Sequence, residues 1–368
     1  MNKKVVVVGR RIQTALGDGE QTWSGLTGGC SGLSPFFLPG FTDEYPLGMV
    51  ELLTGPIGSY ARLLELIRHL VVGYELLSEI AAEAELLVAT TKGAADEILS
   101  GNINSLQGQA WQIGKLAAEQ YGIKGEVQTI SAACASGTLA LIRGAQRIRA
   151  GNTKIAVILG IDLVSRFVAA GFASLKGLAP KHCRPFDQQR DGLALGEGAG
   201  LIILADEEYA HSQGLPCEAR LSGWATGCDG VHITAPCREG SGLTSVLRQI
   251  IEHSDLPVGG INAHGTGTMY NDAMELTAFA NIWGDEIPPV HSVKGAIGHC
   301  LGAAGVIEAA IAISSLQQGV IPPTTGLRQT ENSFLPISPS TSLPLSHPSI
   351  LSCNSGFGGI NAAVLFSQ

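Results

Sequence analysis

The sequence of 368 residues contains few charged and few aromatic side chains. Charged residues make up 15% of the chain and aromatic residues 5%, whereas hydrophobic residues make up 45%. Intrinsic disorder requires low hydrophobicity and high net charge, so this composition excludes it. The net charge of −9 and the lack of any run of Lys or Arg argue against nucleic-acid binding, which needs a basic surface.

Metal-binding and redox motifs are missing as well. None of the eight cysteines forms a C-x-x-C pair, so neither a zinc ribbon nor a thioredoxin-like motif is indicated. The four valines after Lys4 are too short for a secretory signal. The apolar run 302–313 is too short to span a membrane and contains Glu308. We therefore expect no membrane span, mostly reduced cysteines and a cytoplasmic location.

Glycine, by contrast, is abundant, with 48 residues in the chain. The usual share is about 7%, and the glycines follow no G-x-y period, which excludes a collagen-like chain. Together with the scarcity of aromatic residues, this abundance indicates elements that pack backbone to backbone and are joined by tight turns.

Strands and helices alternate along the chain, a pattern that indicates an α/β layered fold. Continuous apolar runs at 5–8, 154–160 and 195–204 are typical of strands buried on both faces. Helical periodicity extends over 62–84 and 111–120. The length allows about two domains, or one large duplicated domain.

Two features recur about half a chain apart and indicate a weak internal repeat. A Gly-rich turn leads into an apolar strand at 195–204 and again at 357–366. Helices of small residues end at Gly151 and at Gly319. We expect two halves that pack as one body, residues 1–208 and residues 209–368.

The first candidate for chemistry is Cys134, which lies between a short strand and a helix in the segment SAACASG. A thiol at a helix N-terminus meets the positive end of the helix dipole, which lowers the thiol pKa and favours a nucleophile. The small neighbours allow a tight turn and close approach of a substrate. Taken alone, the residue is equally consistent with a buried, inert cysteine.

Two histidines lie on Gly-rich loops further along the chain. His264 stands in AHGTGT after a short strand, and His299 stands in KGAIGH before a helix of small residues. A helix N-terminus disfavours the imidazolium, so a neutral ring there can donate from Nε2–H to a carbonyl oxygen. The alternative interpretations are a solvated turn for His264 and a packed helix start for His299.

The last candidate segment is the Gly-rich loop NSGFGG, which spans 354–359 and contains one aromatic residue. Its backbone N–H groups could stabilise an oxyanion, or the loop could simply be a turn into the last strand. Each of these signals is weak by itself. A Cys and two His on three Gly-rich loops, in this order, form a more specific pattern.

The four segments SAACASG, AHGTGTMYNDAME, KGAIGHCLGAAG and NSGFGG resemble the signature segments of β-ketoacyl synthases. These are the condensing enzymes of fatty-acid and polyketide synthesis. Segments 184–200 and 232–236 also match, and the similarity extends from Val5 to Leu365. It implies the thiolase fold, an α/β fold of duplicated βαβαβαββ halves in five layers (αβαβα), normally dimeric.

The resemblance implies an acyltransferase, a 3-oxoacyl-acyl-carrier-protein synthase that elongates a fatty-acid or polyketide chain. Cys134 would take the acyl chain from acyl carrier protein (ACP). His264 and His299 would donate hydrogen bonds to the malonyl-ACP thioester and stabilise the enolate left by decarboxylation, before a Claisen condensation. Two histidines, rather than His and Asn, correspond to the elongating type.

Further roles follow from the same resemblance. Lys294 would organise the His299 side of the site, paired with Glu275, and Asp272 would support the site. Phe357 and Gly358 belong to the oxyanion and gating segment. Phe357 would control access of the second substrate, and its backbone N–H would form the oxyanion hole with that of Cys134. No metal and no other cofactor is implied.

The implied partners are ACP and a second subunit, in a homodimer or a ketosynthase heterodimer. Because ACP is strongly acidic and this chain is acidic too, docking requires a local basic patch. The candidates are Arg62, Arg68, Lys176, Lys181 and Arg184.

The sequence departs from the family in several places. The segment between 87 and 131 and the loop at 177–184 are short, and a Phe common in the family between Ser355 and Gly356 is missing. These changes concern the acyl pocket and its lid. They leave an alternative function, a non-catalytic partner subunit of a heterodimeric type II ketosynthase, similar to a chain-length factor. Such subunits usually lose the nucleophilic cysteine, which this chain keeps at Cys134.

Overall fold

The structure is a computed structural model that describes residues 3–101, 106–254, 256–331 and 335–368. The strands of its central sheet are β1 (Val5–Thr14), β2 (Gly17–Asp18), β5 (Glu85–Ala89), β6 (Val127–Ile130), β7 (Ile155–Asp162), β9 (Gly198–Asp206), β10 (Ala219–Cys228), β11 (Ile261–Asn262), β12 (Val290–His291), β15 (Ser349–Gly356) and β16 (Ile360–Ser367). Two small sheets consist of β3 (Leu33–Phe37), β4 (Glu44–Gly48) and β8 (Leu195–Gly196), and of β13 (Val320–Ile321) and β14 (Leu343–Pro344).

Helices cover both faces of the central sheet and also separate its two halves. They are α1 (Gly19–Thr27), α2 (Tyr60–Val71), α3 (Glu75–Ile80), α4 (Ala95–Ser100), α5 (Ala110–Tyr121), α6 (Ser136–Arg149), α7 (Arg166–Ser174), α8 (Glu207–Ser212), α9 (Ser241–Ser254), α10 (Met269–Trp283), α11 (Lys294–Ile297), the 3-10 helix η1 (Leu301–Ala303) and α12 (Ala304–Gln318). Within the described parts of the chain, no helix combines the length and the apolar character needed to cross a membrane.

The strand order reveals the duplication. The path through the sheet is β12-β11-β15-β16-β10-β1-β9-β7-β5-β6, so the order β1-β9-β7-β5-β6 repeats as β10-β16-β15-β11-β12. The pairing directions repeat too. The first two pairs of each half are antiparallel, between β1, β9 and β7 and between β10, β16 and β15, and the other two are parallel. Each half therefore has the βαβαβαββ order that the resemblance implies.

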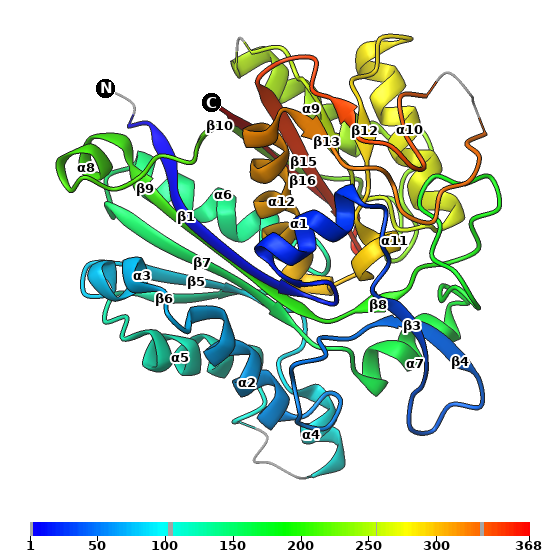
Figure 1. Cartoon of the computed structure of the whole chain (residues 1–368), viewed down its shortest axis with the longest axis horizontal. Coiled ribbons are helices and arrows are strands. Elements are labelled where there is room, and N and C mark those ends of the chain that lie inside the picture. The colour runs from blue at the N-terminus through cyan, green and yellow to red at the C-terminus, as the bar shows by residue number, and fades with distance from the viewer. Residues whose placement is uncertain (1–2, 102–105, 255, 332–334) are drawn as a thin grey trace.

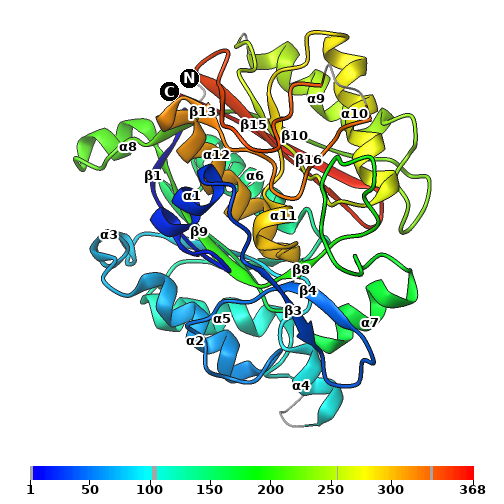
Figure 2. The same cartoon turned by 45° about the vertical axis from the view of Figure 1, so that its right-hand side comes forward.

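The halves stack as five layers, which Figure 1 and Figure 2 show from two sides. Helices α2 and α5 cover one outer face, α9 and α10 cover the other, and α6 and α12 lie between the two half-sheets. Three apolar clusters fill the spaces between these layers. The largest surrounds α6 and α12, which explains why the buried positions of both helices are mostly small and aliphatic residues.

Glycines let the middle helices touch at their N-termini. A Cβ on Gly137 would lie 2.7 Å from the backbone nitrogen of Val306, and a Cβ on Gly305 would lie 2.4 Å from that of Thr138. Since neither position tolerates a side chain, the backbones of α6 and α12 meet directly. Cys134 lies just before α6, and His299 lies shortly before α12. The contact between the two helix N-termini therefore brings the segments of Cys134 and His299 together.

Two predicted elements differ from those observed. The helical pattern over 62–84 is divided into α2 and α3, because the chain turns at Gly73, which has a φ of 66°. The predicted strand 195–204 is divided at Glu197, whose carboxylate leaves the sheet to bind the buried guanidinium of Arg62. The expected boundary between residues 208 and 209 falls inside α8, the helix that precedes β10.

Candidate active site

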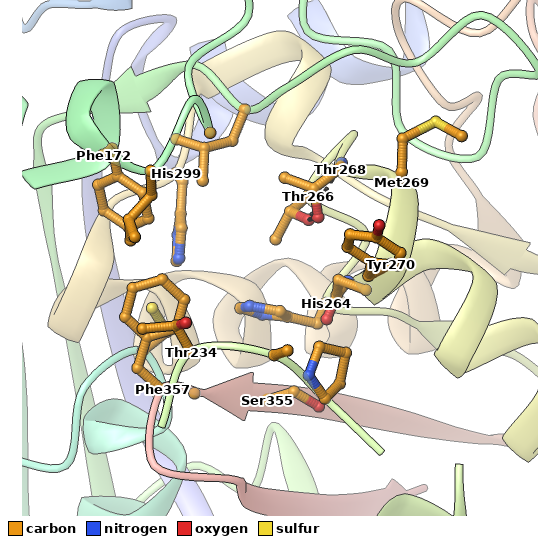
Figure 3. A pocket seen from close by; sticks show the side chains of 18 of the residues that line it. Phe172, Thr234, His264, Thr266, Thr268, Met269, Tyr270, His299, Ser355 and Phe357 are labelled. Carbon is orange, nitrogen blue, oxygen red and sulfur yellow. Dashed lines mark hydrogen bonds between the residues drawn. The ribbon is translucent and has the colours of Figure 1, made fainter. Parts of the chain in front are cut away.

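Three loop segments meet at one pocket of about 360 Å³, and each contributes a residue singled out in the sequence. Cys134 precedes α6, His264 follows β11, and His299 lies between α11 and η1. The ligand-type atoms of the three side chains, one sulfur and two ring nitrogens, all lie within 4.8 Å of one another. The two imidazole rings are nearly perpendicular, with centroids 5.1 Å apart. Figure 3 shows both rings at the pocket.

A tight turn holds Cys134 at the base of the pocket. Ala133 has a φ of 49°, in the left-handed region that residues other than glycine rarely adopt. The hydroxyl of Ser136 stabilises the turn, because it accepts from the N–H of Ala132 at 2.8 Å and donates to the carbonyl of Ala133 at 2.6 Å. The turn that carries Cys134 is therefore fixed by bonds within its own segment.

The expected low pKa of Cys134 is not what the structure gives. Burial raises the pKa of the Cys134 thiol to about 12, and the nearby ammonium of Lys294 opposes this only in part. The sequence argument considered the helix dipole but not the loss of solvent around the sulfur. The thiol is thus protonated at neutral pH.

Hydrogen-bond donors fix the proton position on His264. Its Nδ1 lies 3.3 Å from Nζ of Lys294 and 3.2 Å from Nδ2 of Asn354. Both of these nitrogens can only donate, so Nδ1 must accept and the ring proton must sit on Nε2. Asn354 is itself oriented, because it donates to Glu308 at 2.7 Å and accepts from Thr138 at 2.5 Å.

Lys294 has a different partner from the one expected. Its ammonium forms a buried ion pair with Glu308 of α12 and also donates to the carbonyl of His264. The prediction that Lys294 pairs with Glu275 is therefore wrong, and the hydrogen bonds of Lys294 go to His264 and Glu308. Glu308 lies on the long helix behind the site, and its packing against the loop of His264 could not be read from sequence spacing.

Glu275 and Asp272 instead hold the loop that carries His264. Glu275 accepts from the N–H groups of His264 at 2.7 Å and Gly265 at 2.6 Å. Asp272 accepts from the N–H groups of Thr266 at 2.9 Å and Gly267 at 3.1 Å. Burial, together with the neighbouring Asp272, raises the pKa of Glu275 to about 8. Both side chains act through the backbone of this loop, and their supporting role in the reaction stays a prediction.

His299 is held by its backbone alone. Its N–H donates to the carbonyl of Ala194 at 2.8 Å, and its carbonyl accepts from Gly196 at 3.0 Å. Among the described residues, neither ring nitrogen of His299 has a hydrogen-bond partner. Burial lowers the pKa of both His264 and His299, and the charge of Lys294 lowers both further. Both rings are therefore neutral at pH 7. The Nε2–H of His264 and the ring nitrogens of His299, which have no partner among the described residues, lie at the same pocket.

Phe357 lies over the pocket, where its ring contacts that of Phe172 with centroids 5.5 Å apart (Figure 3). The side chain of Phe357 is 39% exposed, so solvent reaches it at the pocket. The backbone at Gly356 approaches Cys134 closely, since a Cβ there would lie 3.2 Å from the cysteine nitrogen. The expectation that Gly358 serves as an oxyanion donor is wrong, because its N–H already donates to the carbonyl of Ile233 at 2.6 Å.

The same three side chains are of the types that bind zinc. A zinc-bound histidine, however, usually donates its second ring N–H to a carbonyl or carboxylate, which makes the ring a better ligand. His264 has the opposite surroundings, because its second nitrogen accepts from Lys294 and Asn354. This arrangement favours hydrogen-bond donation to a substrate over metal binding.

Comparisons with known proteins identify the family. The sequence profile of the β-ketoacyl synthase N-terminal domain matches residues 77–210, and that of the C-terminal domain matches residues 218–328. Nodulation protein E of Rhizobium meliloti is 31% identical over 304 residues, which cover 81% of this chain and 74% of that protein. The chain belongs to the β-ketoacyl synthase family. Its predicted reaction class, acyl transfer by a condensing enzyme, is confirmed at this level.

Relatives of this synthase cover its whole length. The 3-oxoacyl-[acyl-carrier-protein] synthase 2 of Mycobacterium tuberculosis is 29% identical over 99% of this chain and 97% of that protein. The solved ishigamide ketosynthase/chain length factor matches 100% of both chains with a TM-score of 0.89 and 28% identity. A ketosynthase in complex with its chain length factor from Xenorhabdus doucetiae matches 99% of this chain and 98% of that chain, with a TM-score of 0.88 and 26% identity. These neighbours confirm the thiolase fold.

The motifs divide between the two domains of this synthase. Cys134 lies in the segment matched by the N-terminal domain, whereas His264, Lys294 and His299 lie in that matched by the C-terminal domain. Sequence reasoning missed Glu308, Asn354 and Thr138, which complete the hydrogen-bond network. One signal was present for Glu308, because it is the single charge in the apolar run 302–313.

Proposed function

We propose that the protein is a β-ketoacyl-ACP synthase that condenses malonyl-ACP with an acyl chain held on Cys134. The observation that carries this proposal is the convergence of the Cys134 sulfur and two neutral imidazoles within 4.8 Å at the base of one pocket. A carbonyl placed there receives N–H donors from two rings and lies beside a nucleophile. This is the arrangement that acyl transfer requires.

In the first half-reaction, Cys134 attacks the thioester carbonyl of acyl-ACP. The new S–C bond forms as the thiol proton passes to a neutral imidazole, because the buried thiol holds its proton at neutral pH. His299 is the geometrically free acceptor, since both of its ring nitrogens lack partners among the described residues. Collapse of the tetrahedral intermediate then expels the ACP thiolate, which takes up that proton.

In the second half-reaction, the thioester carbonyl of malonyl-ACP accepts hydrogen bonds from His264 and His299. The bond between the carboxylate and the α-carbon breaks, CO₂ leaves, and the electron pair forms an enolate that these N–H donors stabilise. The Lys294–Glu308 pair and Asn354 keep the His264 proton on Nε2, where it faces the substrate.

Condensation completes the cycle. The enolate carbon attacks the acyl-Cys134 carbonyl, and we assign the oxyanion hole to the backbone N–H groups of Cys134 and Phe357. The intermediate collapses to 3-oxoacyl-ACP and the Cys134 thiolate, which regains one proton from solvent. Overall, acyl-Cys134, malonyl-ACP and one proton give 3-oxoacyl-ACP, CO₂ and free thiol. Phe357 controls access of the malonyl group to this space.

A second function, that of a chain-length-factor-like partner subunit, has one observation in its favour. Two of the similar solved structures are a ketosynthase/chain length factor and a ketosynthase in complex with its chain length factor. The complete set of Cys134, His264, His299 and Lys294 favours the catalytic function, because a purely structural subunit needs none of them. We accordingly propose that the partner is a second synthase-like subunit, in a homodimer or a heterodimer.

ACP, the other proposed partner, has to dock near the pocket mouth. Arg62 is excluded, because its side chain is 6% exposed and bound to Glu197 inside the protein. Lys176 is exposed and lines the pocket, and Lys181 is exposed on the same loop, so these two are the better candidates.

We also place the protein in the cytoplasm, because all eight cysteines are free, and the cytoplasm keeps cysteines in this reduced state.

The repeat boundary is proposed as predicted, with residues 1–208 as the first half and 209–368 as the second. The identical strand orders of the two halves support this division.

One experiment tests the proposed function. The purified chain is incubated with acyl-ACP, and the Cys134 peptide is analysed by mass spectrometry for an acyl adduct. Malonyl-ACP is then added, and 3-oxoacyl-ACP and CO₂ are measured. An adduct on Cys134 that is lost as product forms supports the proposal. A chain that forms no adduct and releases no CO₂, alone and with a co-expressed synthase partner, contradicts it.

A further inference from the structure

Asp162, the last residue of β7, is a buried carboxylate to which the proposed reaction assigns no role. Its side chain is 1% exposed and forms an ion pair with Lys92, whose side chain is 5% exposed. Further donors surround it: the hydroxyl of Thr90 at 3.0 Å, and the N–H and hydroxyl of Thr91, both at 2.9 Å. The backbone N–H of Gly302 donates at 2.8 Å.

These contacts join two segments that are far apart in the chain. Thr90, Thr91 and Lys92 form the exit of β5, whereas Gly302 lies in η1, three residues after His299. The contact with Gly302 is close, because a Cβ on that residue would lie 2.8 Å from the Asp162 carboxylate and 3.0 Å from Cα of Thr90. Asp162 thus anchors the turn that follows His299 to the central sheet.

This anchor matters because His299 lacks side-chain support. Neither of its ring nitrogens has a partner among the described residues, so the ring follows its backbone. The adjacent Leu301 has a φ of 52°, a conformation that costs a non-glycine residue free energy and persists only when its surroundings enforce it. The hydrogen bond from Gly302 to Asp162 directly follows that residue and enforces it.

The turn of Cys134 does not depend on Asp162 in the same way. It is closed by Ser136, which bonds to Ala132 and Ala133, and by the N–H of Ala135, which donates to Ala132 at 3.2 Å. Loss of the Asp162 carboxylate should therefore displace the imidazole of His299 relative to a thiol that stays in place.

We propose that Asp162 is a positioning residue that sets the placement of His299 relative to Cys134, through its hydrogen bond with the N–H of Gly302. Lys92 balances the charge of this carboxylate in the interior. The inference rests on the proposed function, in which His299 takes part, and the decarboxylation of the malonyl thioester is the step that reports on its placement.

The test compares two partial reactions in Asp162→Ala. Decarboxylation of malonyl-pantetheine, a small thioester that avoids ACP docking, reports on His299, and alkylation of Cys134 by iodoacetamide, followed by peptide mass spectrometry, reports on the thiol. We expect decarboxylation to fall at least tenfold while alkylation does not fall, because the charge of Asp162 helps to raise the pKa of the Cys134 thiol and its loss favours the thiolate. An equal loss of both, as partial unfolding causes, overturns the proposal.

Rescue distinguishes the hydrogen bond from the charge. In the double variant Lys92→Met with Asp162→Asn, the amide oxygen can still accept from Gly302, and no lone charge remains. We expect decarboxylation to recover to within about threefold of the wild type. A double variant as defective as Asp162→Ala overturns the proposal.

Asp206→Ala is the matched control. Asp206 is also a buried acid at a strand end, where it caps α8 and binds Lys3, but it lies at the other end of the β7–β9 pair. We expect this variant to lose stability without changing the ratio of decarboxylation to alkylation.

A third measurement is independent of activity. In protein labelled with [¹³Cε1]histidine, the His299 signal is assigned with His299→Asn, and we expect it to shift in Asp162→Ala but not in Asp206→Ala. An unshifted signal overturns the placement. A wild-type chain that forms no acyl adduct and does not decarboxylate contradicts the proposed function instead, and the spectrum still decides whether Asp162 places His299.

Discussion

The Nζ atom of Lys294 lies 3.3 Å from Nδ1 of His264 and also forms an ion pair with Glu308, inside a protein interior where both charged side chains are almost fully buried. The ammonium therefore acts on two partners at once. It helps to fix the tautomer of His264. Burial lowers the pKa of both histidines, and the ammonium lowers it further by opposing a second positive charge.

Replacement of the charge should change the pH dependence of the reaction. In Lys294→Met, one cause of the low pKa of His264 and His299 disappears, so both pKa values rise toward their usual range. Since the neutral rings are the active form, the acidic limb of the decarboxylation profile should move to higher pH. We also expect at least a tenfold lower rate at pH 7, because only Asn354 is left to hold the tautomer of His264 and Glu308 loses its charge partner. A pH–rate profile with malonyl-pantetheine measures both effects, and an acidic limb that does not move contradicts this account.

Removal of the partner charge should destabilise the fold. Glu308→Gln leaves the Lys294 ammonium unpaired in the interior, and loss of one partner of a buried ion pair costs about 3–5 kcal/mol. Glu126→Gln is the matched control, because Glu126 pairs with Arg147 at the surface and is 52% exposed. That change should cost about 1 kcal/mol or less. Urea unfolding of the two variants measures the difference, and equal midpoints are inconsistent with a buried pair.

The thiol of Cys134 should show its high pKa in chemical modification. Because only the thiolate reacts, the rate of alkylation by iodoacetamide should rise about tenfold per pH unit from pH 7 to pH 9, without a plateau. Peptide mass spectrometry separates Cys134 from the exposed Cys30 in the same sample. A plateau below pH 8 for Cys134 shows instead that the helix dipole outweighs burial.

The aromatic contact at the pocket opening should protect the acyl intermediate. In Phe357→Ala, the ring that covers the site beside Phe172 is lost, so water reaches acyl-Cys134 more easily. We expect hydrolysis of the acyl-enzyme to increase several-fold and condensation to slow. Phe37→Ala serves as the control, because Phe37 is 58% exposed on β3, away from the pocket. Equal hydrolysis rates in the two variants mean that Phe357 does not gate the site.

Much of the site was predictable because its reactive residues stand in short local motifs. Gly-rich turns around Cys134, His264 and His299 are visible in the sequence, and the repeat of the two halves predicted that they share one fold. The partners of these residues were not predictable in this way. Glu275 is near His264 in sequence and was assigned to Lys294, but the partner is Glu308, which reaches the site only because α12 packs behind it.

The pKa of Cys134 was missed for a related reason. A helix N-terminus can be recognised from sequence, whereas the loss of solvent around a sulfur depends on every layer that covers it. The hydrogen bond between Thr138 and Asn354 was overlooked because the two residues come from opposite halves of the chain. They meet only in the folded protein, where β15 approaches α6.

The repeated strand order relates two residues of the pocket. Cys134 follows β6 and precedes α6, and His299 follows β12 and precedes α12, so the two residues stand at equivalent turns of the two repeats. The pocket therefore combines one turn from each half of the chain, and the same structural position presents a thiol in the first half and an imidazole in the second.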